Sequence, residues 1–195
     1  LKVMTPSTSP TNHERLRREV RVGRSLQHPG LIRIHELHED GERLMVAMEY
    51  LPGGTLAARL KGGPLPVDEV VEVARQALEA LAYLHGQRVV HRDVKPSNLL
   101  LDADGRLKLA DFGLARPLDE TATLTVTGAA LGTLAYMSPE QLLGQEAGPP
   151  ADLYSLGVTL HELLTGERPA RIGSPSSGVG SLLPGPQGSL RPQRP

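Results

Sequence analysis

Residues 91–98 read His91-Arg92-Asp93-Val94-Lys95-Pro96-Ser97-Asn98, and residues 111–113 read Asp111-Phe112-Gly113. Between them lie two short apolar runs, Leu99–Leu101 and Leu107–Ala110, joined by the turn-forming residues Asp102-Ala103-Asp104-Gly105. Short apolar runs on either side of such a turn indicate a β-hairpin. Because a hairpin brings its two ends together, we expect Asn98, at its entry, to lie close to Asp111, at its exit.

The side chains at this end of the hairpin suit phosphoryl transfer. Oxygen ligands from Asn98 and Asp111, placed side by side, suit Mg²⁺, which keeps several waters and takes phosphate oxygens as further ligands. Asp93 and Lys95 are two residues apart in an extended loop and can face the same site. The carboxylate offers an acceptor for a hydroxyl proton, and the ammonium group offers a positive charge for a phosphate.

Each motif alone also has a purely structural explanation. An Asp-Phe-Gly triplet occurs in ordinary turns, and an isolated His-Arg-Asp can form a surface ion pair. At about 5% usage per residue type, however, eight fixed positions coincide by chance on the order of once in 10^10 starting points. The combined pattern therefore favours one functional site over two unrelated loops.

Apolar periodicity predicts two long helices. From Val67 to His85, apolar residues recur with a 3.6-residue period, which predicts a helix with a broad buried face. These residues are Val67, Val70, Val71, Ala74, Ala77, Leu78, Leu81 and Leu84. A second helix is predicted from Asp152 to Leu164, and Gly166 is expected to end it. Its apolar residues are Leu153, Leu156, Leu160, Leu163 and Leu164.

The first sixty residues predict one early helix and short strands. Thr11 or Asn12 can cap a helix that runs to about Leu26, with Leu16, Val20 and Gly23 on one stripe. The apolar runs Leu31–Ile34 and Leu44–Met48 predict paired strands. The polar segment Glu39-Asp40-Gly41-Glu42 is expected to form the turn between them.

Composition limits the class of protein. The chain has 195 residues, 39% apolar and 22% charged, which is typical of one globular domain. The absence of cysteine excludes disulfides and thiolate metal sites, and a net charge of -1 gives no general attraction for nucleic acid or membrane. No apolar run reaches the ~20 residues of a membrane span. The start at Leu1 suggests a fragment, and the Pro, Gly and Ser content of 169–195 predicts a disordered tail.

The combined motifs resemble the signature of the eukaryotic-type serine/threonine protein kinases, His-Arg-Asp-x-Lys-x-x-Asn followed by Asp-Phe-Gly. The resemblance covers about residues 1–168, and the sequences of 49–56 and 152–158 are similar to those of the bacterial branch of the family. It implies an α+β, bilobal kinase-like fold, truncated at both ends. Residues 1–50 would form the remainder of a β-rich N-lobe and the start of the hinge, and 51–168 would form part of a mainly helical C-lobe.

The resemblance assigns roles to residues outside the two motifs. Lys2 matches the lysine that grips the ATP phosphates, and Glu19 matches the glutamate that pairs with it. Residues 46–51 match the hinge, with Met48 at the gatekeeper position. The nucleotide-binding set is Lys2, Met48, Glu49, Leu51 and Leu100, of which Glu49 and Leu51 meet the adenine edge through their backbones. The implied catalytic residues are Asp93, Lys95, Lys2 and Glu19, the implied metal ligands are Asn98 and Asp111, and the implied supporting residues are His91, Glu140 and Asp152.

The resemblance also implies regulation through the activation segment, which ends in the stretch 132–140. Arg92, just before Asp93, is the feature of kinases that are switched on when a phosphate in this segment pairs with the arginine. The candidate phosphorylation sites are Thr121, Thr123, Thr125 and Thr127, and Phe112 and Gly113 belong to the same regulatory region. Lys95 and Thr133 match serine/threonine rather than tyrosine kinases.

The chain departs from the kinase pattern at four places. No glycine-rich loop precedes Lys2, and the proline-rich tail stands where further helices are expected after Leu164. The arginine that would pair with Glu140 is among these losses, which is costly if Glu140 is buried. Gly23 stands where the family has a bulky residue against Phe112, which removes packing and lowers helix propensity.

The expected cofactors are ATP and Mg²⁺, with Mn²⁺ as an alternative ion. The expected partners are protein substrates that carry Ser or Thr, including a second copy phosphorylated in trans, and neither nucleic acid nor a membrane segment within this chain. Cytoplasmic placement is expected, with any membrane anchor outside these residues. Two alternatives stay open, a pseudokinase-like scaffold that binds without catalysis and an inactive fragment.

Overall fold

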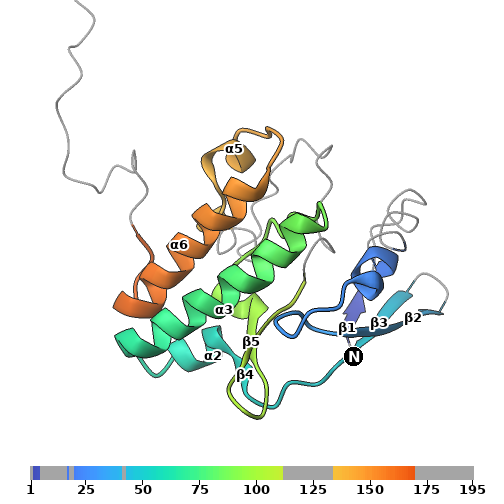
Figure 1. Cartoon of the computed structure of the whole chain (residues 1–195), viewed down its shortest axis with the longest axis horizontal. Helices are drawn as coiled ribbons and strands as arrows, with labels where there is room; N and C mark the ends of the chain where they lie inside the picture. The colour runs from blue at the N-terminus through green and yellow to red at the C-terminus, as the bar shows by residue number, and fades with distance from the viewer. Residues whose placement is uncertain (1, 5–16, 18–19, 41–42, 112–133, 170–195) are drawn as a thin grey trace, which may run out of the picture.

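The computed structural model describes residues 2–4, 17, 20–40, 43–111 and 134–169, with the backbone alone at 2–4, 40, 43 and 44. Two parts are joined by a single extended segment after residue 48, as Figure 1 shows. One part is a small antiparallel sheet with a helical segment against it, and the other is mainly helical. The predicted α+β, bilobal architecture is therefore confirmed. Residues 170–195, and with them the predicted tail, lie outside the described residues.

The first sheet has the strand order β1-β3-β2, with β1 at Lys2–Met4, β2 at Ile34–Asp40 and β3 at Arg43–Met48. Both pairings are antiparallel, and Lys2 lies opposite Val46. Val46 is completely buried, and Val20 and Gly23 in the helical segment at 20–25 are also buried. The part of the predicted early helix before residue 17 lies outside the described residues.

The predicted first strand, Leu31–Ile34, is wrong in its position. The strand begins at Ile34, where the prediction ended, and Glu39 and Asp40, predicted as a turn, pair with Leu44 and Arg43 in the ladder. Leu31 and Ile32 are buried because they contact the other lobe, where Leu31 forms an isolated parallel bridge with Leu109. The strand was missed because most of its residues are polar and exposed, so it lacks an apolar alternation.

A second small sheet lies in the helical lobe and contains the predicted hairpin. Its strands are β4 at Gly54–Thr55, β5 at Leu99–Leu101 and β6 at Leu107–Leu109, in the order β4-β5-β6. The turn is held by Asp102, whose Oδ1 accepts hydrogen bonds from the backbone N–H groups of Asp104 and Arg106, each at 2.9 Å. Gly105 adopts a φ of 77°, which is the left-handed region that glycine tolerates. The predicted hairpin is confirmed.

Both long helices are confirmed. They are α3 at Val67–Gly86 and α6 at Pro149–Thr165, and they pack against each other. Gly166 caps α6 in the left-handed conformation, and its N–H donates to the carbonyl of Glu162 at 2.8 Å. The shorter helices are α2 at Leu56–Leu60 and α5 at Pro139–Leu142, and the 3-10 turn η1 spans Pro96–Asn98. No helix in the described ranges is long and apolar enough to span a membrane.

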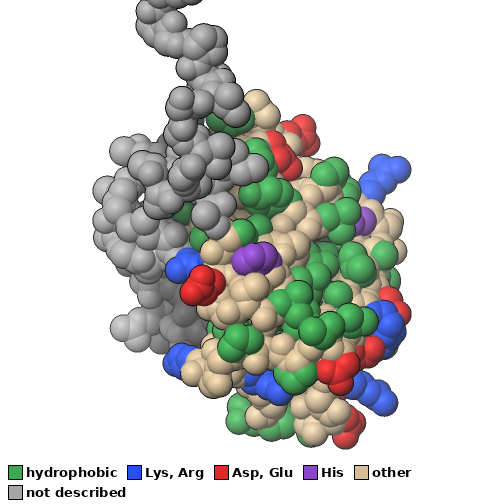
Figure 2. Space-filling model, turned by 90° about the vertical axis from the view of Figure 1, so that its left-hand side faces the viewer, with side chains coloured by type: hydrophobic (Ala, Val, Ile, Leu, Met, Phe, Trp, Pro, Cys, Tyr) green, Lys and Arg blue, Asp and Glu red, His purple; other side chains and the backbone are tan. Residues whose placement is uncertain are grey.

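The predicted buried faces of these helices are partly wrong. Val67, Val71 and Leu78 of α3 are 68%, 62% and 45% exposed, and Leu153 and Leu164 of α6 are also exposed. The buried face of α3 is narrower and includes Val73 and Ala80, which the pattern did not select. Figure 2 looks at the side of the molecule where α6 lies in Figure 1 and shows many hydrophobic side chains on that surface. Periodicity identified apolar positions correctly but could not tell which have a packing partner.

The difference between Leu84 and Leu78 tests the orientation of α3. Leu84 is completely buried, so Leu84→Ala should lower the free energy of unfolding by about 2–5 kcal/mol. Leu78→Ala, on the exposed side of the same helix, is the matched control and should cost under ~1 kcal/mol. Urea denaturation followed by circular dichroism measures both, and equal losses would contradict the orientation.

Candidate active site

The loop that carries the predicted catalytic residues is held by one buried carboxylate. Asp152, in the first turn of α6, is completely buried. Its Oδ2 accepts the backbone N–H of His91 at 2.9 Å, and its Oδ1 accepts the backbone N–H of Arg92 at 2.7 Å. The Nε2 of His85, near the end of α3, lies 2.7 Å from Oδ2. The carboxylate thus links α3, α6 and the start of the loop.

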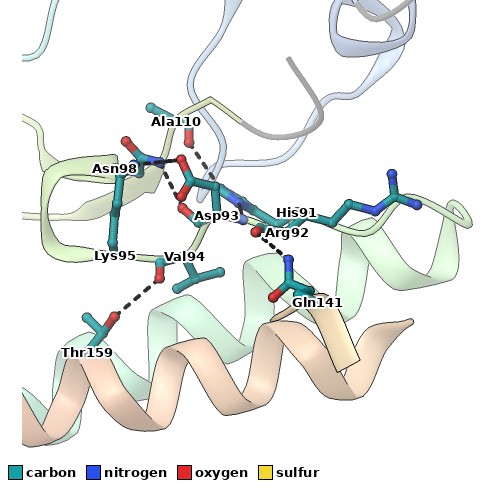
Figure 3. Close-up of polar contacts among 9 residues, drawn as sticks. All are labelled: His91, Arg92, Asp93, Val94, Lys95, Asn98, Ala110, Gln141 and Thr159. Atoms are coloured by element: carbon teal, nitrogen blue, oxygen red, sulfur yellow. Dashed lines mark hydrogen bonds and ion pairs between the residues drawn. The ribbon is translucent and has the colours of Figure 1, made fainter. Parts of the chain in front are cut away.

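Two further side chains hold the loop at other points, as Figure 3 shows. Gln141 of α5 donates from Nε2 to the carbonyl of Arg92 at 2.9 Å. Thr159 of α6 donates from Oγ1 to the carbonyl of Val94 at 3.4 Å. The loop backbone therefore has partners on two helices, which is what a buried or half-buried loop needs to satisfy its polar groups.

His91 links the loop to the residue before Asp111. Its ring is buried, with Nε2 3.0 Å from the carbonyl of Ala110. Its Nδ1 accepts the backbone N–H of Asp93 at 3.3 Å, so the neutral form protonated on Nε2 satisfies both contacts. Burial lowers the pKa of His91 below its ordinary value, against the opposing effect of nearby carboxylates, first Asp152 and then Asp93. The imidazole is therefore a neutral connector at neutral pH.

Asp93, Lys95 and Asn98 form one polar cluster (Figure 3). The Oδ2 of Asp93 lies 2.7 Å from the Nζ of Lys95 and 3.0 Å from the Nδ2 of Asn98. The same Nδ2 donates to the carbonyl of Asp93 at 2.8 Å. No described residue donates a hydrogen bond to Oδ1 of Asp93. One carboxylate oxygen is thus fixed by two donors while the other remains an acceptor.

The hairpin places Asp111 beside this cluster. The N–H of Ala110 donates to the carbonyl of Asn98 at 2.9 Å, so Asp111 follows directly after a residue bonded to Asn98. Asp111 has a φ of 62°, which costs a non-glycine residue about 1–2 kcal/mol. Such a strained residue is stable only where its surroundings determine its conformation.

The donor set fits a hard divalent cation. With Nδ2 of Asn98 bonded to Asp93, the amide oxygen is the atom left to act as a ligand, and Asp111 supplies a half-buried carboxylate. Within the described residues there is no group of three or more His, Cys, Asp and Glu that could hold a metal. Two oxygen ligands with the rest supplied by water and phosphate suit Mg²⁺ better than a metal that needs an all-protein cage.

The predicted hinge residues lie where β3 leaves the first sheet. Met48 ends β3 and, like Leu100 on β5, is half-buried against the core, while Leu51 is buried. The sequence predicted a role for Glu49 through its backbone, but its side chain also forms an ion pair. The Nζ of Lys108, on β6, lies 2.8 and 2.9 Å from the two carboxylate oxygens of Glu49. The segment then passes close to β5, where a Cβ on Gly53 would lie 2.6 Å from the carbonyl of Leu101.

Several predicted residues are only partly described or lie outside the described residues. The backbone of Lys2 is placed on β1, but its side chain, Glu19 and any ion pair between them lie outside. So do Phe112, Gly113, Thr121, Thr123, Thr125, Thr127 and Thr133, and with them the predicted contact between Gly23 and Phe112. Arg92 has a φ of 68°, and its buried Nε has no hydrogen-bond partner in the described part of the chain. Glu140 is half-buried in α5 rather than buried, so the predicted cost of its lost partner is smaller.

Four contributors to the site were missed from the sequence: His85, Gln141, Tyr136 and Lys108. Gln141 could have been found, because Ser138 and Gln141 have capping-box spacing and both of its hydrogen bonds are present at the start of α5. Tyr136 is held by α6, since Ser155 donates to its carbonyl at 2.7 Å and its hydroxyl bonds to Glu162. Burial, and then that bond, raise the pKa of the Tyr136 hydroxyl.

A cavity of about 310 Å³ lies apart from this cluster, between the end of the early helical segment and the start of β2. Its lining includes Arg24, Leu26, Arg33 and Glu36, and none of the predicted site residues.

The chain is similar in sequence to known protein kinases. Residues 1–178 match the family model described as protein kinase domain. The chain is similar to the serine/threonine-protein kinase PknL of Mycobacterium tuberculosis, with 46% identity over 156 residues, which are 80% of this chain and 39% of PknL. It is 42% identical to PrkC of Bacillus subtilis over 156 residues, 80% of this chain and 24% of PrkC. PknB of Mycobacterium leprae is 37% identical over 173 residues, 86% of this chain and 28% of PknB. The chain thus spans well under half the length of these curated relatives, and the resemblance to the bacterial branch is confirmed.

The buried neutral His91 predicts a pH dependence of stability. In the unfolded chain a histidine takes up a proton below about pH 6.5, whereas the lowered pKa keeps folded His91 neutral. Stability should therefore fall as pH drops through that value. We expect His91→Asn to be less stable than wild type at pH 7.5 and the difference to narrow by pH 5.5, because the variant lacks this titration. Urea unfolding at both pH values measures it, and a difference that widens at low pH would contradict the neutral state.

Proposed function

The chain belongs to the protein kinase family, and from that premise we propose that the protein transfers the γ-phosphate of ATP to serine and threonine hydroxyls of protein substrates. One observation carries the proposal: the carboxylate of Asp93 has one oxygen held by Lys95 and Asn98, and the other accepts no hydrogen bond from any described residue. A carboxylate held in this way can accept the proton of a hydroxyl as the hydroxyl attacks phosphorus. The relatives named above are serine/threonine kinases, which supports the same residue specificity here.

Lys95 has a second role in the proposed reaction. Its ammonium group lies 2.7 Å from Asp93, so a phosphate that approaches the hydroxyl also approaches a fixed positive charge. Both side chains are less than one-fifth exposed, and a charge in such surroundings interacts more strongly than one in bulk water. Lys95 would thereby stabilise negative charge that develops on the transferred group.

Asn98 and Asp111 are the residues that would hold the metal, with Mg²⁺ favoured and Mn²⁺ as an alternative. When bound, the ion would supply positive charge to the phosphates. Asn98 has a further task, since its Nδ2 fixes Oδ2 of Asp93 and so couples the metal site to the proton acceptor.

Nucleotide binding is proposed at the hinge. Met48, the backbones of Glu49 and Leu51, and Leu100 would contact the adenine, and Lys2 paired with Glu19 would grip the phosphates. Arg92 and the threonines at 121, 123, 125 and 127 would form a switch that phosphorylation in trans by a second copy operates. Use of ATP places the proposed reaction in the cytoplasm.

Asp93→Asn tests the proposed function. The amide cannot accept a hydroxyl proton as the carboxylate does, so kcat for phosphorylation of myelin basic protein should fall by about 10²-fold or more. The KM for ATP should change little, because the side chain faces the hydroxyl and not the nucleotide base. A radiolabelled Mg·ATP assay with myelin basic protein as generic substrate measures both values.

Asp104→Asn, in the exposed hairpin turn, is the matched control and should keep kcat within about twofold. Wild-type protein that transfers no phosphate to itself or to the basic substrate would overturn the proposed function. An Asp93→Asn variant as active as wild type would remove Asp93 from its role.

A further inference from the structure

The hinge contains an ion pair that the proposed chemistry does not use. The carboxylate of Glu49 lies 2.8 and 2.9 Å from the Nζ of Lys108, and one of its oxygens also accepts the backbone N–H of Arg33 at 2.7 Å. The Lys108 and Glu49 side chains are only 18% and 23% exposed. Since both groups are largely removed from water and satisfied by several bonds, this pair differs from the surface ion pairs that contribute little.

Lys108 lies on the same face of the hairpin as Leu100. The two residues are directly opposite each other in the β5–β6 register, and side chains at opposite positions of an antiparallel pair share one face. Leu99, Leu101, Leu107 and Leu109 lie on the other face and are buried. The face of the hairpin that carries Leu100, which is proposed to contact the adenine, therefore also carries Lys108, the cation that binds the hinge.

The residues around Arg33 complete a closed set of contacts. The N–H of Ile32 donates to the carbonyl of Leu109 at 2.9 Å, and the N–H of Leu109 donates to the carbonyl of Gly30 at 2.8 Å. The N–H of Glu49 donates to the carbonyl of Arg33 at 2.9 Å. The hinge, the segment before β2 and strand β6 are thus tied to one another in pairs, and Lys108 with Glu49 is the one charged link among these contacts of the described residues.

We propose that the Lys108–Glu49 pair is a positioning latch that holds the hinge backbone at a fixed place relative to Leu100 and thereby sets the affinity for the adenine nucleotide. This inference rests on the proposed function. Hydrogen-bonding groups of the backbone at Glu49 and Leu51 bind a flat base well only if they are already in place, because ordering them on binding costs affinity. The latch acts through these backbone groups and does not touch the reacting atoms.

Three variants test the latch: Lys108→Gln, Glu49→Gln and the double substitution. Glu49→Gln keeps an oxygen for the N–H of Arg33, removes the charge and replaces the second oxygen that accepts from Lys108 with an NH2 donor. We expect each single variant to raise the Kd for Mg·ATP by about three- to tenfold in calorimetry and to raise the KM for ATP similarly, while kcat at saturating ATP stays within about twofold. The double variant should lose no more than either single one, because both remove the same interaction.

Lys108→Arg preserves the charge and should keep the Kd within about twofold of wild type. Lys61→Gln removes an exposed lysine at the end of α2 and is the control for net charge, with no expected change in Kd. If Lys108→Gln fails to fold, as seen by circular dichroism, Glu49→Gln and Lys108→Arg carry the test.

Different results would overturn the proposed function and the latch. Wild-type protein that does not bind Mg·ATP would overturn the proposed function and the latch with it. Wild-type protein that binds Mg·ATP, together with Glu49→Gln and Lys108→Gln variants of unchanged Kd, or with additive losses in the double variant, would overturn the latch and leave the proposed function standing.

Discussion

The structure depends most on the buried carboxylate of Asp152. A carboxylate without water is costly by several kcal/mol unless it is fully bonded, and here two backbone N–H groups and the His85 ring take the place of water. The two backbone contacts also hold the loop at residues 91 and 92, where Arg92 adopts a left-handed conformation. The same hydrogen bonds therefore satisfy the buried charge and hold the catalytic loop. Helix α6, some 60 residues later in the chain, is thus part of the site.

From this anchor the polar contacts run through the loop to the hairpin. His91 joins Asp93 to Ala110, Asn98 joins Asp93 to the strand exit, and Asp111 follows with its strained backbone. Each step is a bond between residues that are half-buried or buried, where hydrogen bonds are strong and unpaired groups are costly. The polar contacts continue from the hairpin toward the other lobe through β6. Leu109 of this strand bonds to the segment at 30–32, and Lys108 bonds to the hinge in the proposed latch.

Local sequence predicted the parts of this structure whose causes are local. The helices at 67–86 and 149–165 follow from their apolar period and a glycine stop, and the hairpin follows from its turn residues. Asp93 and Lys95 lie together, as their spacing in one extended loop predicts. Strand β2 was misplaced because its residues are mostly polar, and its position is determined by pairing with β3. The side-chain partners of Asp152 and Glu49 were also missed, since His85 and Lys108 meet them only after the chain has folded. The exposure of Val71 and Leu78 likewise depends on neighbours that periodicity cannot describe.

Amide hydrogen exchange at His91 and Arg92 tests the anchor most directly. If Asp152 holds the loop as described, both amides should exchange only on large-scale unfolding in the wild-type protein. Asp152→Ala should then speed exchange at these two positions by about 10²-fold relative to the amide of Leu109, which is protected independently because it donates to the carbonyl of Gly30. Rapid exchange of His91 and Arg92 in the wild-type protein, or rates that Asp152→Ala leaves unchanged, would contradict the account.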